Sequence, residues 1–354
     1  MMEPTGGVAV VIAQVLPSDL VVKVRNLSPR VALSYAGELL ATERYRLREQ
    51  SASADPDLAG ISEQIDDMFA GAEVIFAPAL PFPNILSRFG PDKAPGLKWL
   101  QALSAGVDQF VPSGLLDRDV VITTGRGLAS QAIAEYVIWA VLTLNRNMHQ
   151  RFRDQMGRVW ARGRMPTRLL NMQTIGIVGI GAIGSAVAKL AKGLGMRVIA
   201  ARRSAVSRSS GVDGVDEVFP SADLLSLLGQ SDFVVIAVPH TGETRGMIGE
   251  RELRAMKPTA SLINIARGEI IDQGALIAAL KEKRIMGAAL DVFTTEPLPP
   301  TSELWDLPSV IVTPHVSAGG GDTTEAAVEL FSQNLLRYLN GQPLINVYDR
   351  ERGY

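Results

Sequence analysis

Residues 174–184 read TIGIVGIGAIG, and their pattern indicates the fold class of the chain. A run of β-branched residues leads into a G-x-G-x-x-G turn made by Gly179, Gly181 and Gly184, and a helical stretch follows. In such a turn the first glycine allows the sharp bend, the second lets a pyrophosphate approach the backbone, and the third lets the helix pack on the strand. Free N–H groups at the helix start then meet the phosphate charge. The alternative is a plain strand–helix turn with glycine for packing, but the strand-then-helix context favours a dinucleotide site.

The stretch belongs to a longer alternation of apolar runs and helical segments, which predicts a parallel, doubly wound α/β sheet with right-handed crossovers. The predicted strands are 175–179, 197–201, 233–238, 261–266, 288–292 and 310–313, and the predicted helices are 182–194, 222–228, 250–256 and 273–283. A smaller α/β unit precedes residue 125, with strands expected at 8–15, 31–34, 74–77, 99–103 and 120–123. The helix expected at 129–144 is apolar nearly all round, which requires burial between domains or subunits. A last helix, after residue 322, lies outside the alternation and is expected to return to the first unit.

The composition excludes several chemistries. The chain has 354 residues, no cysteine and three histidines, His149, His240 and His315, so a thiol nucleophile, a disulfide framework and a histidine-rich metal site are not expected. The net charge of −2 gives no basis for nucleic-acid or membrane partners. Glycines interrupt the uncharged window 169–188, and no secretory signal is visible, so the expected location is cytoplasmic.

The residues that follow the second strand of the dinucleotide unit are Arg202, Arg203 and Ser204. An acidic residue is expected near this position when the ligand is NAD(H), because it binds the ribose hydroxyls. Guanidinium groups can instead hold a 2′-phosphate bidentately. The sequence therefore predicts a preference for NADP(H), with NAD(H) as the second cofactor; the alternative is that these arginines are only solvated surface charge.

Polar residues stand at the ends of three later strands, in the segments 264–268, 290–297 and 312–315. Ligands of open α/β sheets bind at the carboxyl ends of the strands, so Arg267, Asp291, Glu296 and His315 are expected to converge there. An arginine can bind the carboxylate of a 2-oxo acid, a histidine can donate a proton to its carbonyl, and a carboxylate can fix the imidazole tautomer. The alternatives are an ion-pairing arginine, a core histidine, a loop carboxylate and a turn-capping aspartate.

Taken together, the segments GIVGIGAIG (176–184), INIARGEIIDQGALIAAL (263–280), ALDVFTTEPLP (289–299) and VTPHVS (312–317) resemble the D-isomer-specific 2-hydroxyacid dehydrogenase family. The resemblance implies an Arg–Glu–His catalytic set carried by Arg267, Glu296 and His315. It implies a Rossmann cofactor domain over 126–318 and a discontinuous, flavodoxin-like substrate domain over 1–125 and 319–354, both doubly wound. It also implies homodimers that bury the helix at 129–144.

The resemblance further implies which residues line the ligands. Asp291 is expected to face the nicotinamide carboxamide, and the loop Ser104, Ala105, Gly106 and Val107 is expected to bind the substrate carboxylate together with Arg267. The full set of expected cofactor contacts is Gly179, Gly181, Ala182, Ile183, Gly184, Arg202, Arg203, Ser204, Val238, Pro239, Thr244, Ile265, Ala266 and Asp291. Two segments depart from the family pattern, Arg126 where a proline is common and the glycine-rich 316–322, and both bear on substrate preference.

The predicted function is NAD(P)H-dependent reduction of a small 2-oxo acid, of the glyoxylate or hydroxypyruvate type, to the D-2-hydroxy acid. A phosphoglycerate dehydrogenase-like enzyme is one alternative, although Arg202 replaces its usual ribose-binding acid. A formate dehydrogenase is disfavoured because that family pattern pairs its histidine with glutamine rather than with a glutamate such as Glu296. A non-catalytic NAD(P)-sensing interaction protein of the same fold is the alternative from another class.

Overall fold

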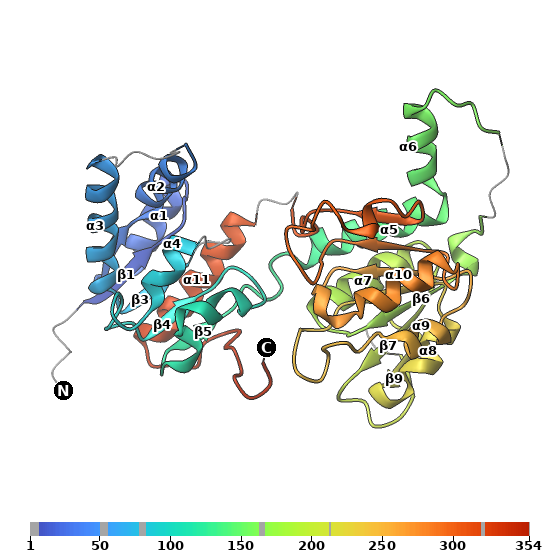
Figure 1. Ribbon diagram of the computed structural model, residues 1–354. Helices are drawn as coiled ribbons and strands as arrows, with labels where there is room; N and C mark the ends of the chain where they lie inside the picture. The colour runs from blue at the N-terminus through green and yellow to red at the C-terminus, as the bar shows by residue number, and fades with distance from the viewer. Residues whose placement is uncertain are drawn as a thin grey trace. The chain divides into compact units, whose positions relative to one another are not determined.

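The computed structural model describes residues 7–49, 56–77, 83–162, 167–211, 214–319 and 323–353. The chain divides into two compact units, one made of Met1–Leu128 with Asp322–Tyr354 and the other of Ala129–Gly321 (Figure 1). The sequence predicts boundaries at 125/126 and 318/319, and part of the glycine-rich segment there, residues 320–322, lies outside the described residues.

The larger unit contains an eight-stranded sheet within the described residues, in the order β13-β12-β11-β10-β6-β7-β9-β8. Its strands are β6 (Thr174–Val178), β7 (Arg197–Arg202), β8 (Ser209–Ser210), β9 (Glu217–Pro220), β10 (Phe233–Ile236), β11 (Ser261–Asn264), β12 (Gly287–Leu290) and β13 (Val310–Val312). Strands β6, β10, β11 and β12 are buried along their whole length, as expected for parallel strands covered on both faces.

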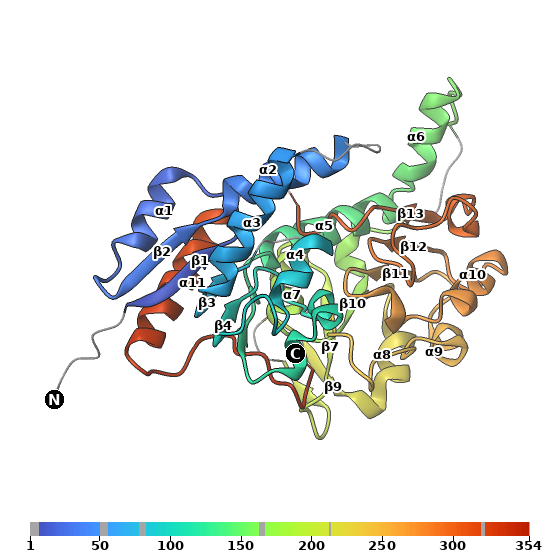
Figure 2. The same cartoon turned by 60° about the vertical axis from the view of Figure 1, so that its left-hand side comes forward.

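Helices cover both faces of this sheet (Figure 2). On one face α5 (Ser130–Asn145) and α7 (Ala182–Gly193) pack on alternate strand residues such as Ile177, Val198 and Val235. On the other, α8 (Leu224–Gln230), α9 (Glu250–Ala255) and α10 (Gln273–Lys281) pack on residues such as Val178, Ile199 and Val234. The predicted doubly wound α/β class is confirmed.

The sheet departs from the prediction at one edge. Strands β8 and β9 are not predicted from the sequence, and β8 pairs with β9 antiparallel, so the sheet is not wholly parallel. The two residues of β8 are exposed serines, which carry no apolar strand pattern. Helix α6 (Met148–Met156) is also unpredicted, because it is largely polar and none of its residues is buried.

The smaller unit has a five-stranded parallel sheet in the order β2-β1-β3-β4-β5, which is the flavodoxin-like order. Its strands are β1 (Val8–Ile12), β2 (Val31–Tyr35), β3 (Val74–Phe76), β4 (Trp99–Gln101) and β5 (Val121–Thr123), and its helices are α1 (Ser18–Arg25), α2 (Gly37–Glu49), α3 (Pro56–Ala70), α4 (Pro83–Leu86) and α11 (Thr324–Leu339). The last helix lies on this sheet, where the Phe331 ring stacks on Phe76 at 4.5 Å between centroids. The first unit is therefore built from both ends of the chain.

Candidate functional site

The glycine-rich turn after β6 has the shape that a dinucleotide phosphate requires. Gly179 has φ +103°, and a Cβ there would lie 2.6 Å from the Ala237 carbonyl oxygen; a Cβ on buried Gly184 would lie 2.2 Å from the Gly179 carbonyl oxygen. A Cβ at Gly181 would meet no atom within 4 Å. Gly181 also precedes α7 without any side-chain cap, so no side chain competes for the free N–H groups of exposed Ala182 and of Ile183. These residues fit a bound dinucleotide, whose phosphates the start of α7 would hold.

The basic residues at the end of β7 are open to solvent. Arg202, Arg203 and Ser204 are all exposed. The Arg203 guanidinium pairs with the exposed Glu243 carboxylate at 3.2 Å, whereas the Arg202 guanidinium has no hydrogen bond or ion pair to any described residue. An exposed ion pair of this kind contributes only about 0–1 kcal/mol, so a phosphate can displace Glu243 from Arg203.

The turn after β10 is held by one hydroxyl. Thr244 Oγ1 donates to the Pro239 carbonyl at 2.7 Å and accepts from the Thr241 N–H at 2.8 Å. Val238 is half-buried and Pro239 is exposed, while Ile265 and Ala266 lie buried after β11. Cofactor contacts of these five predicted residues remain predictions, but Thr244 has a clear role in shaping the turn.

The three predicted catalytic residues follow three neighbouring strands, β11, β12 and β13, at their carboxyl ends. His315 Nδ1 lies 2.8 Å from Glu296 Oε2, and the other Glu296 oxygen accepts the Phe293 N–H at 2.9 Å. A carboxylate can only accept, so Nδ1 carries the hydrogen and Nε2 is left for a ligand. The His315 side chain is 47% exposed, which leaves that nitrogen accessible. The structure therefore brings His315 and Glu296 within hydrogen-bond distance, and their catalytic role stays a prediction.

Arg267 is fixed through its backbone. The Asn264 side chain, 1% exposed, donates to the Arg267 carbonyl at 2.9 Å and accepts from the Ala266 N–H at 3.1 Å. A Cβ on Gly268 would lie 1.9 Å from the Phe293 carbonyl carbon, so only glycine lets this turn lie against the loop that carries Glu296. The Arg267 guanidinium donates to the Ala266 carbonyl at 2.8 Å. This hydrogen bond restricts the orientation of the half-buried side chain.

Asp291 is fully buried, and its carboxylate already has three donors. Oδ1 accepts from the Thr313 hydroxyl at 2.6 Å and from the Val316 N–H at 2.9 Å, and Oδ2 accepts from the Ser317 N–H at 2.8 Å. Each of these partners follows β13, in the loop that carries His315. The structure places Asp291 under this loop, and its contact with the nicotinamide carboxamide stays a prediction.

The predicted carboxylate-binding loop follows β4 in the smaller unit. Ser104 Oγ donates to the Gly106 carbonyl at 2.7 Å and accepts from Gln109 at 2.5 Å, while Gly125 N–H donates to the Ser104 carbonyl at 3.0 Å. Among the described residues, no acceptor binds the N–H groups of Ala105, Gly106 and Val107. The Val107 side chain is buried in the core, so this residue can offer a ligand its backbone only.

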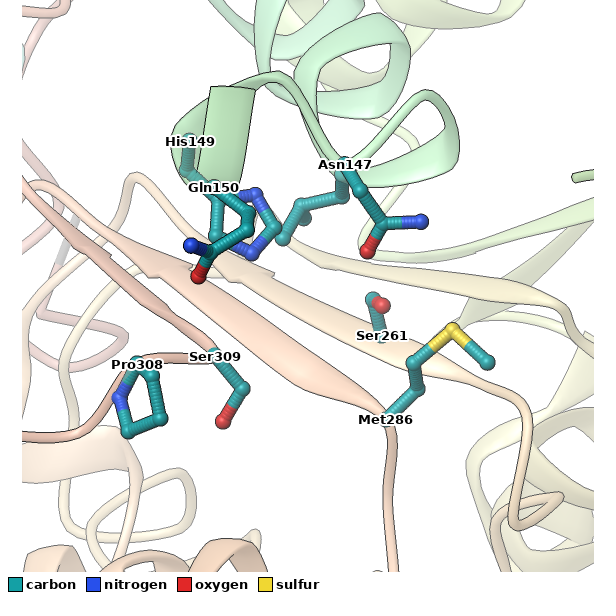
Figure 3. A pocket seen from close by; sticks show the side chains of 8 residues that line it. Asn147, His149, Gln150, Ser261, Met286, Pro308 and Ser309 are labelled. Atoms are coloured by element: carbon teal, nitrogen blue, oxygen red, sulfur yellow. The ribbon is translucent and has the colours of Figure 1, made fainter. Parts of the chain in front are cut away.

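A hollow of about 180 Å³ lies at the other end of the larger sheet (Figure 3). Asn147, His149 and Gln150 face residues that precede β12 and β13 or begin β11, namely Ser261, Met286, Pro308 and Ser309. Burial and the charge of Arg153 lower the pKa of His149, and its Nδ1 has no hydrogen-bond partner among the described residues. This hollow lies at the amino ends of the strands, whereas Arg267, Glu296 and His315 follow their carboxyl ends. His149 is therefore not a second acid beside His315.

Other kinds of site find no support in the described part of the chain. No cluster of three or more histidine, aspartate or glutamate side chains is arranged to hold a metal ion within those residues. Nor does any described helix combine the length and apolarity that crossing a membrane requires.

Three residues that contact the site residues or their partners are not predicted from the sequence: Asn264, Thr313 and Tyr136, whose hydroxyl lies 2.6 Å from that of Thr313. Asn264 ends an apolar strand and Thr313 precedes Pro314-His315, so both positions adjoin residues that are predicted. A polar side chain at the end of a buried strand is a usable signal for such a role. Tyr136, in contrast, lies in an apolar helix where its hydroxyl gives no pattern.

Comparison with known proteins agrees with this geometry. Residues 138–317 match the family model described as the D-isomer specific 2-hydroxyacid dehydrogenase, NAD binding domain. A glyoxylate reductase from Thermococcus gammatolerans is 38% identical over 259 residues, which cover 71% of this chain and 76% of that protein. Another from Korarchaeum cryptofilum is 35% identical over 267 residues, covering 73% and 78%.

Solved structures extend the similarity to the whole chain. A D-isomer specific 2-hydroxyacid dehydrogenase from Xanthobacter autotrophicus Py2, in complex with NADPH and MES, aligns with a TM-score of 0.75 at 28% identity, covering 99% of this chain and all of the other. An NADPH-dependent glyoxylate/hydroxypyruvate reductase from Sinorhizobium meliloti, in complex with NADP and sulfate, aligns with a TM-score of 0.73 at 25% identity, covering 98% and 99%. The predicted family is confirmed: this chain belongs to the D-isomer specific 2-hydroxyacid dehydrogenases and is an NAD(P)-dependent oxidoreductase.

Proposed function

We propose that this enzyme reduces glyoxylate, hydroxypyruvate or a 2-oxo acid of similar size to the D-2-hydroxy acid, with NADPH as the preferred reductant. The observation that carries the proposal is the His315–Glu296 pair at 2.8 Å. Its two members follow β13 and β12, the two strands next in order to β11, which precedes Arg267. The relatives named glyoxylate reductase support the substrate class.

The residues have complementary roles in this proposal. The nicotinamide, when bound, supplies the hydride. His315 donates the proton that the substrate oxygen requires, while Glu296 holds the imidazole in the tautomer that leaves Nε2 facing the substrate. Arg267 binds the substrate carboxylate and polarises its carbonyl. In the smaller unit, the N–H groups of Ala105, Gly106 and Val107 are also suited to bind a carboxylate.

The experiment is steady-state turnover of NADPH with glyoxylate, hydroxypyruvate, pyruvate and 3-phosphohydroxypyruvate. We expect the highest kcat/KM with glyoxylate or hydroxypyruvate. A higher value with 3-phosphohydroxypyruvate would instead favour a phosphoglycerate dehydrogenase-like enzyme. Binding of NADPH without turnover of any of the four acids would favour a sensor.

The preference for NADP(H) depends on the arginines after β7. We expect Arg202→Ala combined with Arg203→Ala to lower the ratio of kcat/KM for NADPH to that for NADH by about 10- to 100-fold, because charge-assisted bonds to the 2′-phosphate are lost. Steady-state kinetics with both cofactors measure this ratio. Arg208→Ala is the control, since Arg208 pairs with Asp223 at 2.8 Å and its guanidinium lies over the Phe219 ring. A wild-type enzyme that prefers NADH, or a ratio unchanged in the double variant, would contradict the assignment.

We also propose that the enzyme is a homodimer that uses α5 and α6. Trp139 and Leu142 of α5 are each 41% exposed, and Phe152 and Met156 of α6 are exposed as well. We expect Trp139→Glu combined with Phe152→Glu to shift the sedimentation coefficient from dimer to monomer, because two charges cannot be buried unpaired in an apolar contact. Val206→Glu, which charges another exposed apolar position, is the control. A wild-type monomer, or a dimer that withstands both charges, would refute this interface.

A cytoplasmic location completes the proposal, without nucleic-acid or membrane partners. The absence of cysteine in the chain and its net charge of −2 support it.

A further inference from the structure

A chain of short hydrogen bonds connects α5 to the loop of His315. Tyr136 Oη lies 2.6 Å from Thr313 Oγ1, which in turn donates to Asp291 Oδ1 at 2.6 Å. A carboxylate only accepts and a threonine hydroxyl has one hydrogen, so the Thr313 hydrogen goes to Asp291. The Tyr136 phenol must therefore donate to Thr313, which makes the chain directional from α5 to Asp291.

The same carboxylate determines the backbone around His315. Asp291 accepts the N–H groups of Val316 and Ser317 through its side chain, at 2.9 and 2.8 Å, and the His315 N–H through its own carbonyl, at 2.8 Å. His315 has φ +55°, in the left-handed region that side chains other than glycine rarely adopt. Such a conformation persists only where surrounding bonds require it, and here Asp291 provides those bonds.

Burial and charge keep the Tyr136 phenol protonated, and they make each hydrogen bond between Tyr136, Thr313 and Asp291 depend on the others. Burial, together with the negative charge of Asp291, raises the pKa of Tyr136 to about 12, so the phenol remains a donor at neutral pH. Asp291 is fully buried, and no described cation pairs with it. A buried carboxylate stabilised by hydrogen bonds alone is sensitive to the loss of any one donor.

We propose that Tyr136 and Thr313 are positioning residues of the reaction, which act through Asp291 to hold His315 where its imidazole meets both Glu296 and the substrate. The inference rests on the proposed role of His315. Tyr136 belongs to α5, which has an exposed face on its other side. The proposal gives this residue a role in the reaction at the carboxyl end of β13. Neither residue touches the substrate in this account, so each affects the rate only through the geometry of the His315 loop.

The experiment compares Tyr136→Phe and Thr313→Val with Thr313→Ser. We expect the first two to lower kcat by about 10- to 100-fold, because a small displacement of a catalytic group is enough for such a loss. The Kd for NADPH, measured by fluorescence titration, is expected to change far less than kcat, because neither variant removes a side chain that is predicted to contact the cofactor. Thr313→Ser keeps the hydroxyl and is expected to retain kcat within about twofold. Tyr338→Phe is the matched control, because it removes a hydroxyl that donates to Glu73 at 2.7 Å in the smaller unit; its kcat stays at the wild-type value.

Two results would overturn the proposal. One is a Tyr136→Phe enzyme with the wild-type kcat. If the Tm of this variant falls as far as that of Tyr338→Phe while kcat is unchanged, the Tyr136 hydroxyl has only a structural role. The other is equal loss in Thr313→Ser and Thr313→Val, which would exclude the hydroxyl as the cause. If Thr313→Val does not fold, Tyr136→Phe decides alone because it keeps the ring. His315→Gln in the same assay separates the two claims: if it retains turnover, the role of His315 fails, whereas an inactive His315→Gln beside an unaffected Tyr136→Phe refutes only the positioning chain.

Discussion

His315→Gln is expected to lower kcat for reduction of glyoxylate by about 10²- to 10⁴-fold, the range that general acid catalysis contributes. Glutamine can still donate a hydrogen bond near the substrate, but it cannot transfer a proton. The Nδ1 contact with Glu296 at 2.8 Å leaves Nε2 as the nitrogen that we propose for this transfer. The measurement is kcat under saturating NADPH and glyoxylate, together with the Kd for NADPH, which should change little because the phosphate-binding turn is intact.

His240→Gln is the control for this prediction. His240 lies in the turn after β10, at the rim of the predicted cofactor site, and is half-buried. No described hydrogen bond links its ring to a carboxylate that could fix a tautomer, unlike His315. We therefore expect kcat within about threefold of the wild-type value for His240→Gln, well below the loss expected for a general acid. A larger loss of kcat in His240→Gln than in His315→Gln would show that the acid has been assigned to the wrong histidine.

Arg267→Ala is expected to lower kcat/KM for glyoxylate by about 10²- to 10³-fold, the size of effect seen when one group that stabilises a developing oxyanion is removed. The hydrogen bond from the Asn264 side chain and the close approach at Gly268 fix the backbone of Arg267. The fall in kcat/KM should therefore come from the missing guanidinium and not from a change in the backbone turn. Arg267→Lys keeps the charge but not the planar pair of donors, and should recover only part of the loss.

Rescue by added guanidinium makes the Arg267 prediction sharper. Low concentrations of guanidinium chloride should restore part of kcat/KM in Arg267→Ala and none in His315→Gln, because only the first variant lacks a guanidinium. Arg254→Ala serves as the charge control, since Arg254 is exposed and pairs with Glu250 in α9. Arg267→Ala with the wild-type kcat/KM, or equal losses in Arg254→Ala and Arg267→Ala, would contradict direct binding of the substrate carboxylate.

The sequence predicts the central parts of the fold well, because strands buried on both faces give uninterrupted apolar runs. Strands β10 and β11 lie inside their predicted ranges, and β6 begins one residue before its predicted range. The edge is different, since β8 consists of two exposed serines whose pairing depends on β9 rather than on any pattern of their own. The polar helix α6 is not predicted for a related reason. It has no buried face that would give its sequence a helical hydrophobic period.

The same contrast applies to the site. Arg267, Glu296 and His315 can be identified because each is a charged or titratable residue that closely follows a buried strand. Their supporting residues cannot be identified in this way: Tyr136 and Thr313 are 177 positions apart and meet only when α5 packs beside β13. Asp291 is predicted as a cofactor contact, yet what the structure shows is its set of bonds to the His315 loop, which depend on a turn conformation that no sequence pattern reveals.

The configuration of the product tests the proposed reaction as a whole. Hydroxypyruvate is incubated with the wild-type enzyme and NADPH, and the glycerate formed is resolved by chiral chromatography. The expected product is D-glycerate alone, in an amount equal to the NADPH consumed, and the His315→Gln enzyme is expected to form it about 10²- to 10⁴-fold more slowly. L-glycerate, a racemic product, or no consumption of NADPH by the wild-type enzyme with either hydroxypyruvate or glyoxylate would contradict it.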